Sequence, residues 1–429
     1  MSNTIPADWK KNKFENLFNI AIGGTPSRNE PLFWDAECKT GNYWVSIRDL
    51  KGRIISQTAE QITDLGIKKS NVKLVPKGTV IMSFKLSVGR VAFAGRDLYT
   101  NEAIAAFQPI NEKAIDLQYF YQGLHSWDLL GDIDQAVKGV TLNKEKLRNI
   151  EAILPPLPEQ QKIAAILTSV DDVIEKTQAQ IDKLKDLKSG MMQELLTKGV
   201  GIKQGDKYEP HTEFKDSPVG KIPKSWEVQP IADLCSHVVD CVNKTAPVVD
   251  FKTPYKMIRT TNVRHGRVDT ENVRCVSKET YENWTRRIKP ENGDLIFTRE
   301  APVGECGILE DSRGIFLGQR TMMYRANEKK TSSGFLMYSL MSEYGRKQLE
   351  NFSGGSTVPH MRVPDCGKIQ IKTPPLNEQN KILGSLNSVD FSILQKEKKL
   401  AKLLNLKKAL MQDLLTGKVR VRVDNDLVV

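Results

Sequence analysis

Ten arginines lie between Tyr255 and Arg325, a stretch that holds only three lysines. A guanidinium group is planar and presents a rigid fork of N–H donors, which matches the O6 and N7 acceptors of guanine in the major groove. This stretch therefore favours a surface that reads bases. An alternative stays open, because the ten acidic residues of the same stretch could pair with these arginines.

The segment 390–418 has the opposite bias, with seven lysines and no arginine. A lysine ammonium is a strongly hydrated point charge, which suits a solvated helix face or non-specific phosphate contact. Across the chain, 63 basic and 52 acidic residues give a formal net charge of +11. This excess predicts a polyanionic partner, although charge alone does not predict a fold.

Other residue types offer less chemistry. Cys235, His237 and Cys241 could supply three metal ligands, but no fourth ligand stands at a recognisable spacing. The six cysteines never form C-x-x-C, so reduced thiols are expected. The Gly-Gly pairs at 23–24 and 354–355 could cradle phosphates, yet such pairs mostly form turns.

The motifs of several enzyme classes are missing from the sequence. It contains no G-x-x-x-x-G-K-[ST] loop, no F-x-G-x-G and no [ND]-P-P-[YF], and its five histidines are scattered. We therefore expect a non-catalytic chain without a cofactor. No stretch approaches the roughly 18 apolar residues of a membrane span, and the amino terminus lacks the apolar segment of a signal peptide, so a cytoplasmic location is expected.

The chain repeats itself once. LPPLPEQQKI at 154–163 returns as TPPLNEQNKI at 373–382, and MQELLT at 192–197 returns as MQDLLT at 411–416, both at an offset of 219 residues. Trp9 corresponds to Trp226 at a slightly shorter offset. Two copies in one chain of 429 residues predict a pseudo-dimer arranged about an approximate two-fold axis.

Each copy ends in a segment with helical periodicity. Apolar residues recur at spacings of three and four from Ile166 to Leu195, including Val173 and Leu187, and again from Leu386 to Leu414. A helix of about 35 residues would be about 50 Å long. We expect the two helices to form an antiparallel pair, although Lys396 and Lys407 interrupt the second stripe. An ordinary buried helix in one compact domain is the alternative.

The blocks before the helices alternate apolar and polar residues over short runs, such as 79–84 and 294–298, each followed by a Val-Gly turn. Segments 117–130 and 335–349 have helical character. The expected fold class is α+β: two mixed α/β domains separated by two long helices that form an antiparallel, coiled-coil-like pair with pseudo-two-fold symmetry.

With these motifs in view, the chain resembles, over essentially its whole length, the specificity subunits of type I restriction-modification systems. The most specific shared element is Pro-Pro-Leu-x-Glu-Gln-x-x-Ile at the start of each long helix, with Leu-Leu-Thr at its end. GDLIFTREAPVGECGI at 293–308 also resembles the second half of a target recognition domain. In the first block, we align 84–86 with 298–300.

The resemblance implies target recognition domains at 1–153 and 204–373, and conserved helical regions at 154–203 and 374–429. It implies that each recognition domain reads one half of a bipartite, asymmetric site on double-stranded DNA. The paired helices would set the spacer, two methyltransferase subunits would bind, and two restriction subunits would join them. The chain itself would carry no catalytic residue.

We take the candidate DNA contacts from basic and polar residues near the repeated strand-turn positions and before the helices. The candidates for base contact are Arg48, Lys85, Arg90, Arg259, Arg299 and Arg320. The candidates for phosphate contact are Lys138, Thr141, Thr357, His360 and Arg362.

Three alternatives stay open. The chain could serve a methyltransferase-only or type II-like complex that lacks a translocating restriction subunit. It could act on DNA as an enzyme by itself, which the missing motifs disfavour. It could also be a coiled-coil scaffold, whose DNA affinity would depend on salt and not on sequence.

Overall fold

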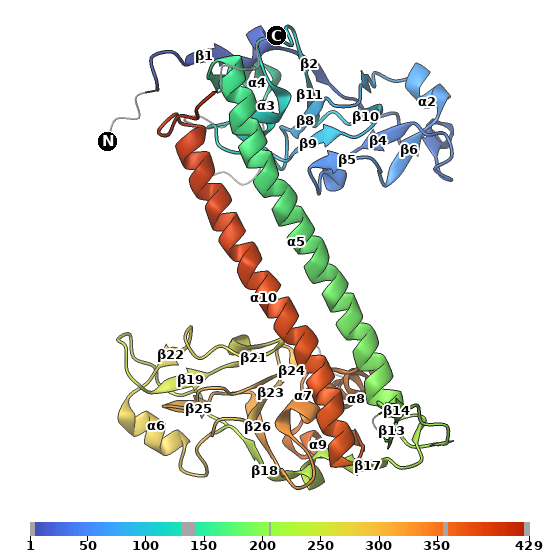
Figure 1. The fold of residues 1–429 in the computed structure, drawn as a ribbon, viewed down its shortest axis with the longest axis vertical. Helices are drawn as coiled ribbons and strands as arrows, with labels where there is room; N and C mark the ends of the chain where they lie inside the picture. The colour runs from blue at the N-terminus through green and yellow to red at the C-terminus, as the bar shows by residue number, and fades with distance from the viewer. Residues whose placement is uncertain (1–4, 130–141, 206, 355–358, 424–429) are drawn as a thin grey trace. The chain divides into compact units, whose positions relative to one another are not determined.

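The computed structural model describes residues 5–129, 142–205, 207–354 and 359–423. The chain divides into two compact units, the first made of 1–178 with 398–429 and the second of 179–397. Each unit combines one head with parts of both long helices, α5 (Leu157–Lys198) and α10 (Leu376–Leu414) (Figure 1). No helix in the described residues combines the length and apolar character that a membrane crossing requires.

The first head consists of β-strands with a few short helices. Its strands are β2 (Phe18–Ile22), β3 (Trp34–Asp35), β4 (Tyr43–Val45), β5 (Ile54–Ile55), β6 (Glu60–Ile62), β7 (Leu74–Val75), β8 (Val80–Ser83), β9 (Val91–Ala94), β10 (Leu98–Thr100) and β11 (Ile104–Pro109). They form two five-stranded sheets, in the orders β3-β6-β4-β10-β7 and β2-β11-β8-β9-β5. The helices are α1 (Phe14–Leu17), α2 (Asp64–Lys68), α3 (Leu117–Leu124) and α4 (Lys144–Asn149), with short 3-10 helices η1 (Pro31–Phe33) and η2 (Ile47–Asp49).

Strand β8 shows why this head needs apolar residues on both faces of one sheet. Val80 and Met82 belong to a core that reaches Ile163 and Leu167 in the first turns of α5. Ile81, which points to the other face, belongs to a second core inside the head. The alternation of side chains along the strand thus divides one run of apolar residues between two cores.

The second head repeats this plan with different sheet sizes. Its strands are β18 (Cys235–Asp240), β19 (Lys256–Ile258), β20 (Val263–Arg264), β21 (Gly266–Val268), β22 (Arg274–Cys275), β23 (Leu295–Arg299), β24 (Val303–Ile308), β25 (Ile315–Leu317) and β26 (Thr321–Ala326). They form a six-stranded sheet, β18-β26-β23-β24-β21-β20, and a three-stranded sheet, β22-β19-β25. The helices are α6 (Lys278–Trp284), α7 (Ser333–Met341), α8 (Glu343–Ser353) and α9 (Val363–Cys366), with η3 (Ile231–Leu234) and η4 (Thr260–Asn262).

Strand β23 divides its side chains as β8 does. Leu295 and Phe297 join a core that includes Leu386 of α10, and Ile296 joins a separate core with Met323. The expected helix 335–349 is divided between α7 and α8, because Ser342 leaves the helical conformation and its Oγ accepts a hydrogen bond from Gly345 N at 3.2 Å.

A two-stranded antiparallel ribbon joins each head to its long helix. β1 (Lys10–Lys13) pairs with β12 (Glu151–Leu154), which leads directly into α5. β17 (Glu227–Pro230) pairs with β27 (Gln370–Thr373), which leads into α10. Four further strands follow α5, namely β13 (Ile202–Gln204), β14 (Lys207–Glu209), β15 (Phe214–Lys215) and β16 (Ile222–Pro223).

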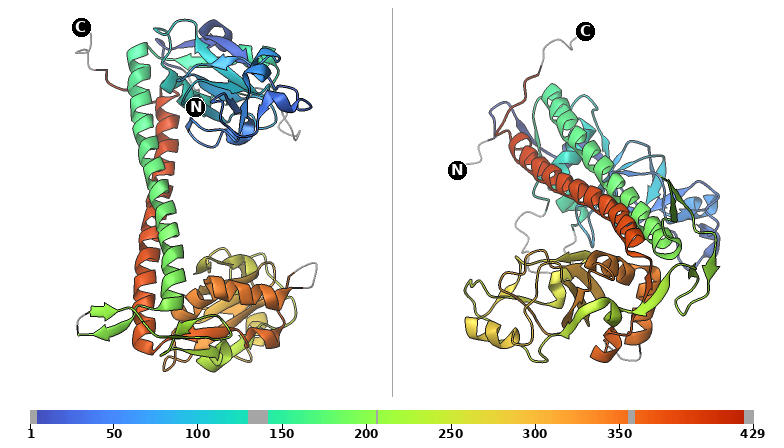
Figure 2. Two further views of the ribbon diagram at one scale, coloured as in Figure 1. Left: turned by 90° about the vertical axis from the view of Figure 1, so that its right-hand side faces the viewer. Right: turned by 60° about the horizontal axis from the view of Figure 1, so that its bottom comes forward.

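The long helices pack as an antiparallel pair within each unit, as the sequence predicts (Figures 1 and 2). In the second unit, Lys185 pairs with Glu397 at 3.2 Å and Lys188 pairs with Asp390 at 2.7 Å, so residue numbers rise along one helix and fall along the other. The α+β prediction is confirmed, with mixed heads and long helices in both copies.

The predicted apolar stripe on α5 is wrong at two positions. Val173 and Leu187 are 38 % and 51 % exposed, whereas Thr177 and Ile181 are 3 % and 1 % exposed. The buried face of α5 also includes the charged residue Asp171, which pairs with Lys407 of α10 at 2.6 Å. An apolar-only pattern misses such a position, because an ion pair replaces an apolar contact there.

Candidate nucleic-acid interface

A buried glutamate near the start of each long helix holds a tryptophan from the beginning of the corresponding copy. Trp9 Nε1 donates to Glu159 Oε2 at 3.2 Å, and Trp226 Nε1 donates to Glu378 Oε2 at 2.9 Å. The two glutamates are 3 % and 5 % exposed. The Pro-Pro-Leu-x-Glu-Gln motif therefore anchors the beginning of each copy to its helix.

The glutamine of the same motif makes the second repeated contact. Gln160 Nε2 donates to Pro155 O and Gln379 Nε2 donates to Pro374 O, both at 2.9 Å. Each amide thus bonds to a carbonyl of the segment that leads into its own helix. These contacts explain why the motif survives in both copies while the heads diverge.

Each buried glutamate also binds the segment that follows the other long helix. Arg420, which follows α10, donates from Nε to Glu159 Oε1 at 2.7 Å. His211, which follows α5, contacts Glu378 Oε1 through Nε2 at 2.9 Å, and Val200 N donates to the same oxygen at 3.0 Å. The repeat therefore extends to the way the copies are joined.

An aspartate in the first half of each long helix makes a further repeated contact. Asp171 accepts hydrogen bonds from Gln122 Nε2 of α3 at 2.6 Å and pairs with Lys407 at 2.6 Å. Asp390 accepts from the hydroxyl of Tyr338 on α7 and pairs with Lys188 at 2.7 Å. Burial, together with the Asp390 carboxylate, raises the pKa of Tyr338, so its hydroxyl remains a donor. Each aspartate thus binds its head to both helices.

The turn between two central strands has the same hydrogen bonds in both heads. In the first head, Ser83 Oγ donates to Ser87 O and accepts from Arg90 N at 3.1 Å. In the second head, Thr298 Oγ1 donates to Pro302 O at 2.6 Å and accepts from Glu305 N at 3.0 Å. A hydroxyl can donate and accept at once, which is why Ser and Thr are interchangeable here.

The backbone of this turn has positive φ values at equivalent positions in both copies, although the Ala301–Pro302 peptide bond of the second copy is cis. Leu86 and Ala301 have φ values of +65° and +52°, and the glycines at 89 and 304 have φ values of +88° and +86°. A positive φ strains residues that carry a Cβ, so its recurrence indicates that the surroundings impose it. The turn is therefore a rigid platform for exposed side chains.

These contacts correct the alignment expected from the sequence. Phe84 N donates to Ala103 O at 2.9 Å, and Arg299 N donates to Arg320 O at 2.9 Å. Phe84 therefore corresponds to Arg299, and Lys85 corresponds to Glu300. The predicted alignment of 84–86 with 298–300 is wrong by one residue. The side chains here have diverged between the copies, so the sequence does not fix the alignment, whereas the backbone hydrogen bonds do.

With the corrected register, the turn presents opposite charges in the two heads. Lys85 and Arg90 of the first head stand where the second head has Glu300 and Glu305. Glu300 pairs with Arg320 Nη1 at 3.0 Å. Glu305 pairs with Arg346 at 3.8 Å, so the shared platform carries basic side chains in one head and paired carboxylates in the other.

The three candidates of the first head lie on neighbouring elements. Arg90 Nη1 donates to Ile47 O at 3.4 Å, next to Arg48 in η2. Lys85 Nζ lies 5.4 Å from the ring of Phe84. A hollow of about 520 Å³ is lined by Arg48, Ile47 and Leu86, and also by Arg28. The sequence prediction missed Arg28, and only its position after the Gly-Gly pair could have indicated it.

The candidates of the second head differ in exposure. Arg259 stands before η4, where its backbone N–H donates to Asn262 Oδ1 at 3.0 Å and its Nη2 donates to Thr261 Oγ1 at 3.4 Å. Arg320 is half-exposed beside Glu300. Arg299 is only 8 % exposed and donates from Nη1 to Met361 O at 3.0 Å, so we leave it out of the interface proposed below.

The candidates for phosphate contact lie largely at the edge of what the structure describes. Lys138, Thr141 and Thr357 lie outside the described residues. His360 is exposed and forms a β-bridge with Glu300. Arg362 Nε pairs with Asp365 at 2.8 Å, and the Arg362 side chain is 76 % exposed.

In the part of the chain that the structure describes, some of the ten arginines between Tyr255 and Arg325 pair with carboxylates, and others do not. Four of the ten form carboxylate pairs within the described residues, namely Arg287, Arg313, Arg320 and Arg325. Arg325 pairs with Asp294, whose side chain is 2 % exposed, so this arginine supports the fold. The structure therefore leaves part of the arginine set available to a ligand.

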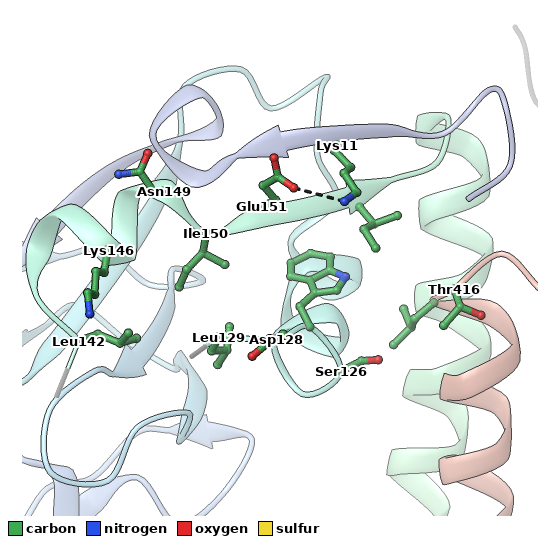
Figure 3. Close-up of a pocket in the computed structure, with 13 residues that line it drawn as sticks. Lys11, Ser126, Asp128, Leu129, Leu142, Lys146, Asn149, Ile150, Glu151 and Thr416 are labelled. Carbon is green, nitrogen blue, oxygen red and sulfur yellow. Dashed lines mark ion pairs between the residues drawn. The ribbon is translucent and has the colours of Figure 1, made fainter. Parts of the chain in front are cut away.

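A larger hollow of about 710 Å³ lies in the first unit, where Trp127, Ile150 and Leu415 line it (Figure 3). Lys11 and Glu151 pair across its rim at 3.4 Å. Its lining also includes residues that directly precede the undescribed segment 130–141, so we assign no ligand to it.

Among the described residues, no group of three or more His, Cys, Asp and Glu side chains is placed to hold a metal ion. All six cysteines are free. Burial raises the pKa of Cys235 to about 12, which keeps this thiol protonated.

The two heads share one hydrogen-bonded frame and differ in the charges on it, so the chain is a duplicated protein. A family model described as the type I restriction modification DNA specificity domain matches residues 6–186 and 223–405. The chain therefore belongs to this family and carries its domain twice.

Individual relatives agree with this assignment. The chain is 29 % identical over 425 residues to the type I restriction enzyme MjaVIII specificity subunit of Methanocaldococcus jannaschii, which covers 97 % of this chain and 94 % of that protein. The fold of this chain resembles the crystal structure of the type I restriction-modification system S subunit from M. genitalium, with a TM-score of 0.58 and 13 % identity. The match covers 96 % of this chain and 97 % of that one. A chain from a structural study of type I complex assembly matches with a TM-score of 0.52 and 14 % identity, covering 97 % of this chain and all of that one.

Proposed function

We propose that this chain is the specificity subunit of a type I restriction-modification complex and reads a bipartite, asymmetric site on double-stranded DNA. The observation that carries this proposal is the strand-turn platform, which both heads build with the same hydrogen bonds and which carries opposite charges in each. Two copies of one platform with different side chains suit two different half-sites. The match to the DNA specificity domain supports the same proposal.

In this proposal, the recognition domains are 1–153 and 204–373, and the helical regions are 154–203 and 374–429. Base contacts come from Arg48, Lys85 and Arg90 in the first head, and from Arg259 and Arg320 in the second. Bidentate contact of arginine with guanine is the commonest specific contact in the major groove. Contacts with phosphates would fix the register of the chain on the duplex.

The chain would act without catalytic residues of its own. We propose that it binds two methyltransferase subunits and, through the assembled complex, two restriction subunits, so that adenine methylation and DNA cleavage take place on those partners. The repeated contacts of Asp171 and Asp390 support this, because each copy presents an equivalent junction of head and helices to an identical partner. The paired long helices would set the unread spacer.

The test is a selection from randomised duplexes by the full chain, purified together with a type I methyltransferase subunit from the same genome. The expected result is two unlike short motifs at a fixed separation. A single motif, or binding that depends on salt but not on sequence, would overturn the proposal. Methylation without cleavage, after a restriction subunit of the same genome is added, would favour the methyltransferase-only alternative.

A further inference from the structure

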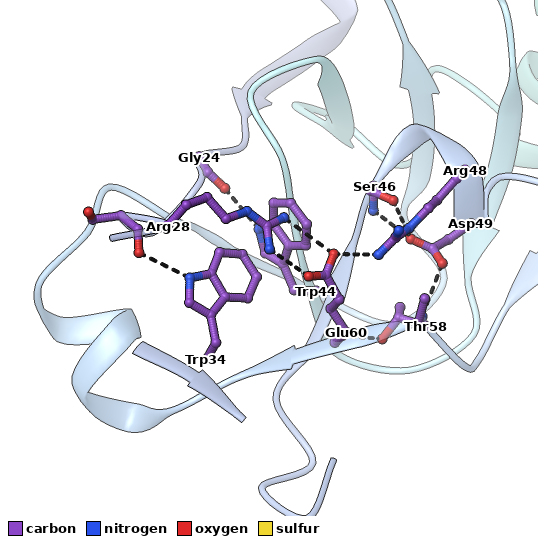
Figure 4. Close-up of polar contacts among 11 residues, drawn as sticks. Gly24, Arg28, Trp34, Trp44, Ser46, Arg48, Asp49, Thr58 and Glu60 are labelled. Atoms are coloured by element: carbon purple, nitrogen blue, oxygen red, sulfur yellow. Dashed lines mark hydrogen bonds and ion pairs between the residues drawn. The ribbon is translucent and has the colours of Figure 1, made fainter. Parts of the chain in front are cut away.

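Two exposed arginines of the first head share a single carboxylate (Figure 4). Arg28 donates to Glu60 through both terminal nitrogens, with Nη1 at 2.5 Å from Oε1 and Nη2 at 3.3 Å from Oε2. Arg48 Nη2 donates to the second oxygen of Glu60 at 2.6 Å. Glu60 lies on β6, Arg48 lies in η2, and Arg28 lies in the loop before η1, so the tertiary fold assembles this cluster.

Arg28 is held in place from a second side. Its guanidinium carbon lies 3.7 Å from the ring centroid of Trp34 and 5.0 Å from that of Trp44. The indole N–H groups are themselves satisfied, since Trp34 donates to Ser27 O at 3.0 Å and Trp44 donates to Gly24 O at 2.9 Å. Stacking and the two-fold contact with Glu60 leave Arg28 little freedom to turn toward another ligand.

Arg48 has the opposite character. Its side chain is 60 % exposed, and one N–H of Nη2 is bonded to Glu60. A guanidinium carries five N–H donors, so most donors of Arg48 have no partner among the described residues. The backbone beneath it is fixed, because Ser46 N donates to Asp49 Oδ2 at 2.8 Å and closes η2.

Glu60 remains charged under ordinary conditions. The hydrogen bond from Arg28 lowers the pKa of Glu60 below its usual range, with smaller contributions from the charges of Arg28 and Arg48. Because Glu60 is ionised, it can orient Arg48 at neutral pH. Arg48 also lines the 520 Å³ hollow together with Ser46 and Asn101, so its free donors adjoin a concave surface with further polar groups.

We propose that Arg48 is the residue of the first head that reads a guanine in the major groove, with Glu60 and Arg28 as its positioning residues. The inference rests on the proposed function and names the base within one half-site. The free N–H groups of Arg48 would donate to O6 and N7 of guanine, while Glu60 fixes the plane of the guanidinium from behind. Pre-organisation of this kind reduces the entropy lost when the contact forms.

The second head does not share this arrangement. Met257 of β19 faces Arg274 of β22, just as Trp44 of β4 faces Glu60 of β6, so Arg274 occupies the position of Glu60. The position of Arg48 in the first head is taken by Thr261 in the second, because Asp49 and Asn262 close corresponding turns. A guanine contact from this position, with a carboxylate behind it, is therefore proposed for the first half-site alone.

The experiment repeats the duplex selection with variants of the full chain in complex with the methyltransferase subunit. Arg48→Ala is expected to reduce the preference for guanine at one position of one half-site by about 5- to 150-fold and to leave the other half-site unchanged. Arg48→Lys is expected to restore affinity but only part of the preference, because an ammonium group can donate to O6 and N7 yet lacks the planar fork. Arg28→Ala and Glu60→Gln are expected to relax the same position by a smaller factor.

Arg96→Ala serves as the matched control, because Arg96 also stacks on an aromatic ring of this head, Tyr43, at 4.2 Å. Arg90 directly precedes β9, whereas Arg96 follows its opposite end. The Arg96→Ala variant is expected to leave the selected sequence unchanged. Circular dichroism of each variant verifies that the head is folded.

The outcomes separate this inference from the proposed function. If the unchanged chain selects two half-sites and Arg48→Ala keeps the same guanine preference, the inference is wrong and the proposed function stands. Equal weakening at all positions would also overturn it, since that result identifies a phosphate contact. If the unchanged chain selects no bipartite site, both fall together.

Discussion

The turn that follows β8 in the first head and the turn that follows β23 in the second have the same closing hydrogen bonds but carry residues of opposite charge. Ser83 and Thr298 close them with equivalent hydrogen bonds, yet Lys85 of the first head corresponds to Glu300 of the second. A similar inversion occurs in the other sheet of each head, where Glu60 of β6 corresponds to Arg274 of β22.

This comparison separates what holds a head together from what it presents. Ser83 and Thr298 are fully buried, and their hydroxyls satisfy backbone groups that would otherwise lose hydrogen bonds. Surface side chains can be exchanged at a cost that is usually within about 0.5 kcal/mol. A frame of buried polar contacts thus lets the exposed charges change without loss of the fold.

The largest expected effect comes from breaking the shared frame. Glu159→Ala and Glu378→Ala are each expected to destabilise their own unit by about 3–5 kcal/mol, because each substitution leaves buried donors without a partner. Native-state hydrogen exchange measures the two units separately. The control is Glu151→Ala, since the Glu151 side chain is 51 % exposed and its pair with Lys11 contributes little. Comparable stability of both glutamate variants and the control would contradict the shared frame.

A smaller effect is expected from the charges on the platform. The double variant Lys85→Ala and Arg90→Ala removes two proposed base contacts, and it is also expected to reduce the salt dependence of DNA affinity, because two positive charges no longer lie near the phosphates. Glu300→Ala in the second head should not flatten it, because a carboxylate releases no counterions from DNA. Titrations at several salt concentrations measure the slopes of log K against log salt, and equal slopes for both variants would remove the charge distinction.

The smallest effect concerns how each head is tied to its helix. Arg53 of the first head pairs with Asp172 of α5 at 2.5 Å and with Glu175 at 3.2 Å. The corresponding residue of the second head is Arg267. In the repeat, Phe391 of α10 stands at the position that Asp172 has in α5. Arg53→Ala is expected to destabilise the first unit by about 0.2–1 kcal/mol, and Arg267→Ala to leave the second unit unchanged. Urea unfolding measures both, and an equal loss in the two variants would contradict the asymmetry.

Much of the architecture follows from repetition along the chain. The Pro-Pro-Leu-x-Glu-Gln motif marks the start of both long helices, and the recurrence of Trp9 as Trp226 marks the start of both copies. These signals are local or recur at a fixed offset, so they can be found without a structure. The positions of Val173 and Leu187 could not be predicted in the same way, because the orientation of a helix depends on the partner that it packs against.

The sequence by itself determined the duplication, the two long helices, the mixed heads and the resemblance to a DNA specificity subunit. It did so because motifs and periodicity are properties of the chain as written. Only the tertiary structure decided the register of the platform, the burial of Arg299 and the meeting of Arg28, Arg48 and Glu60. These depend on strand pairings and loop paths that bring distant residues together, and a hydrogen bond between residues far apart in the chain leaves no spacing signal in one sequence.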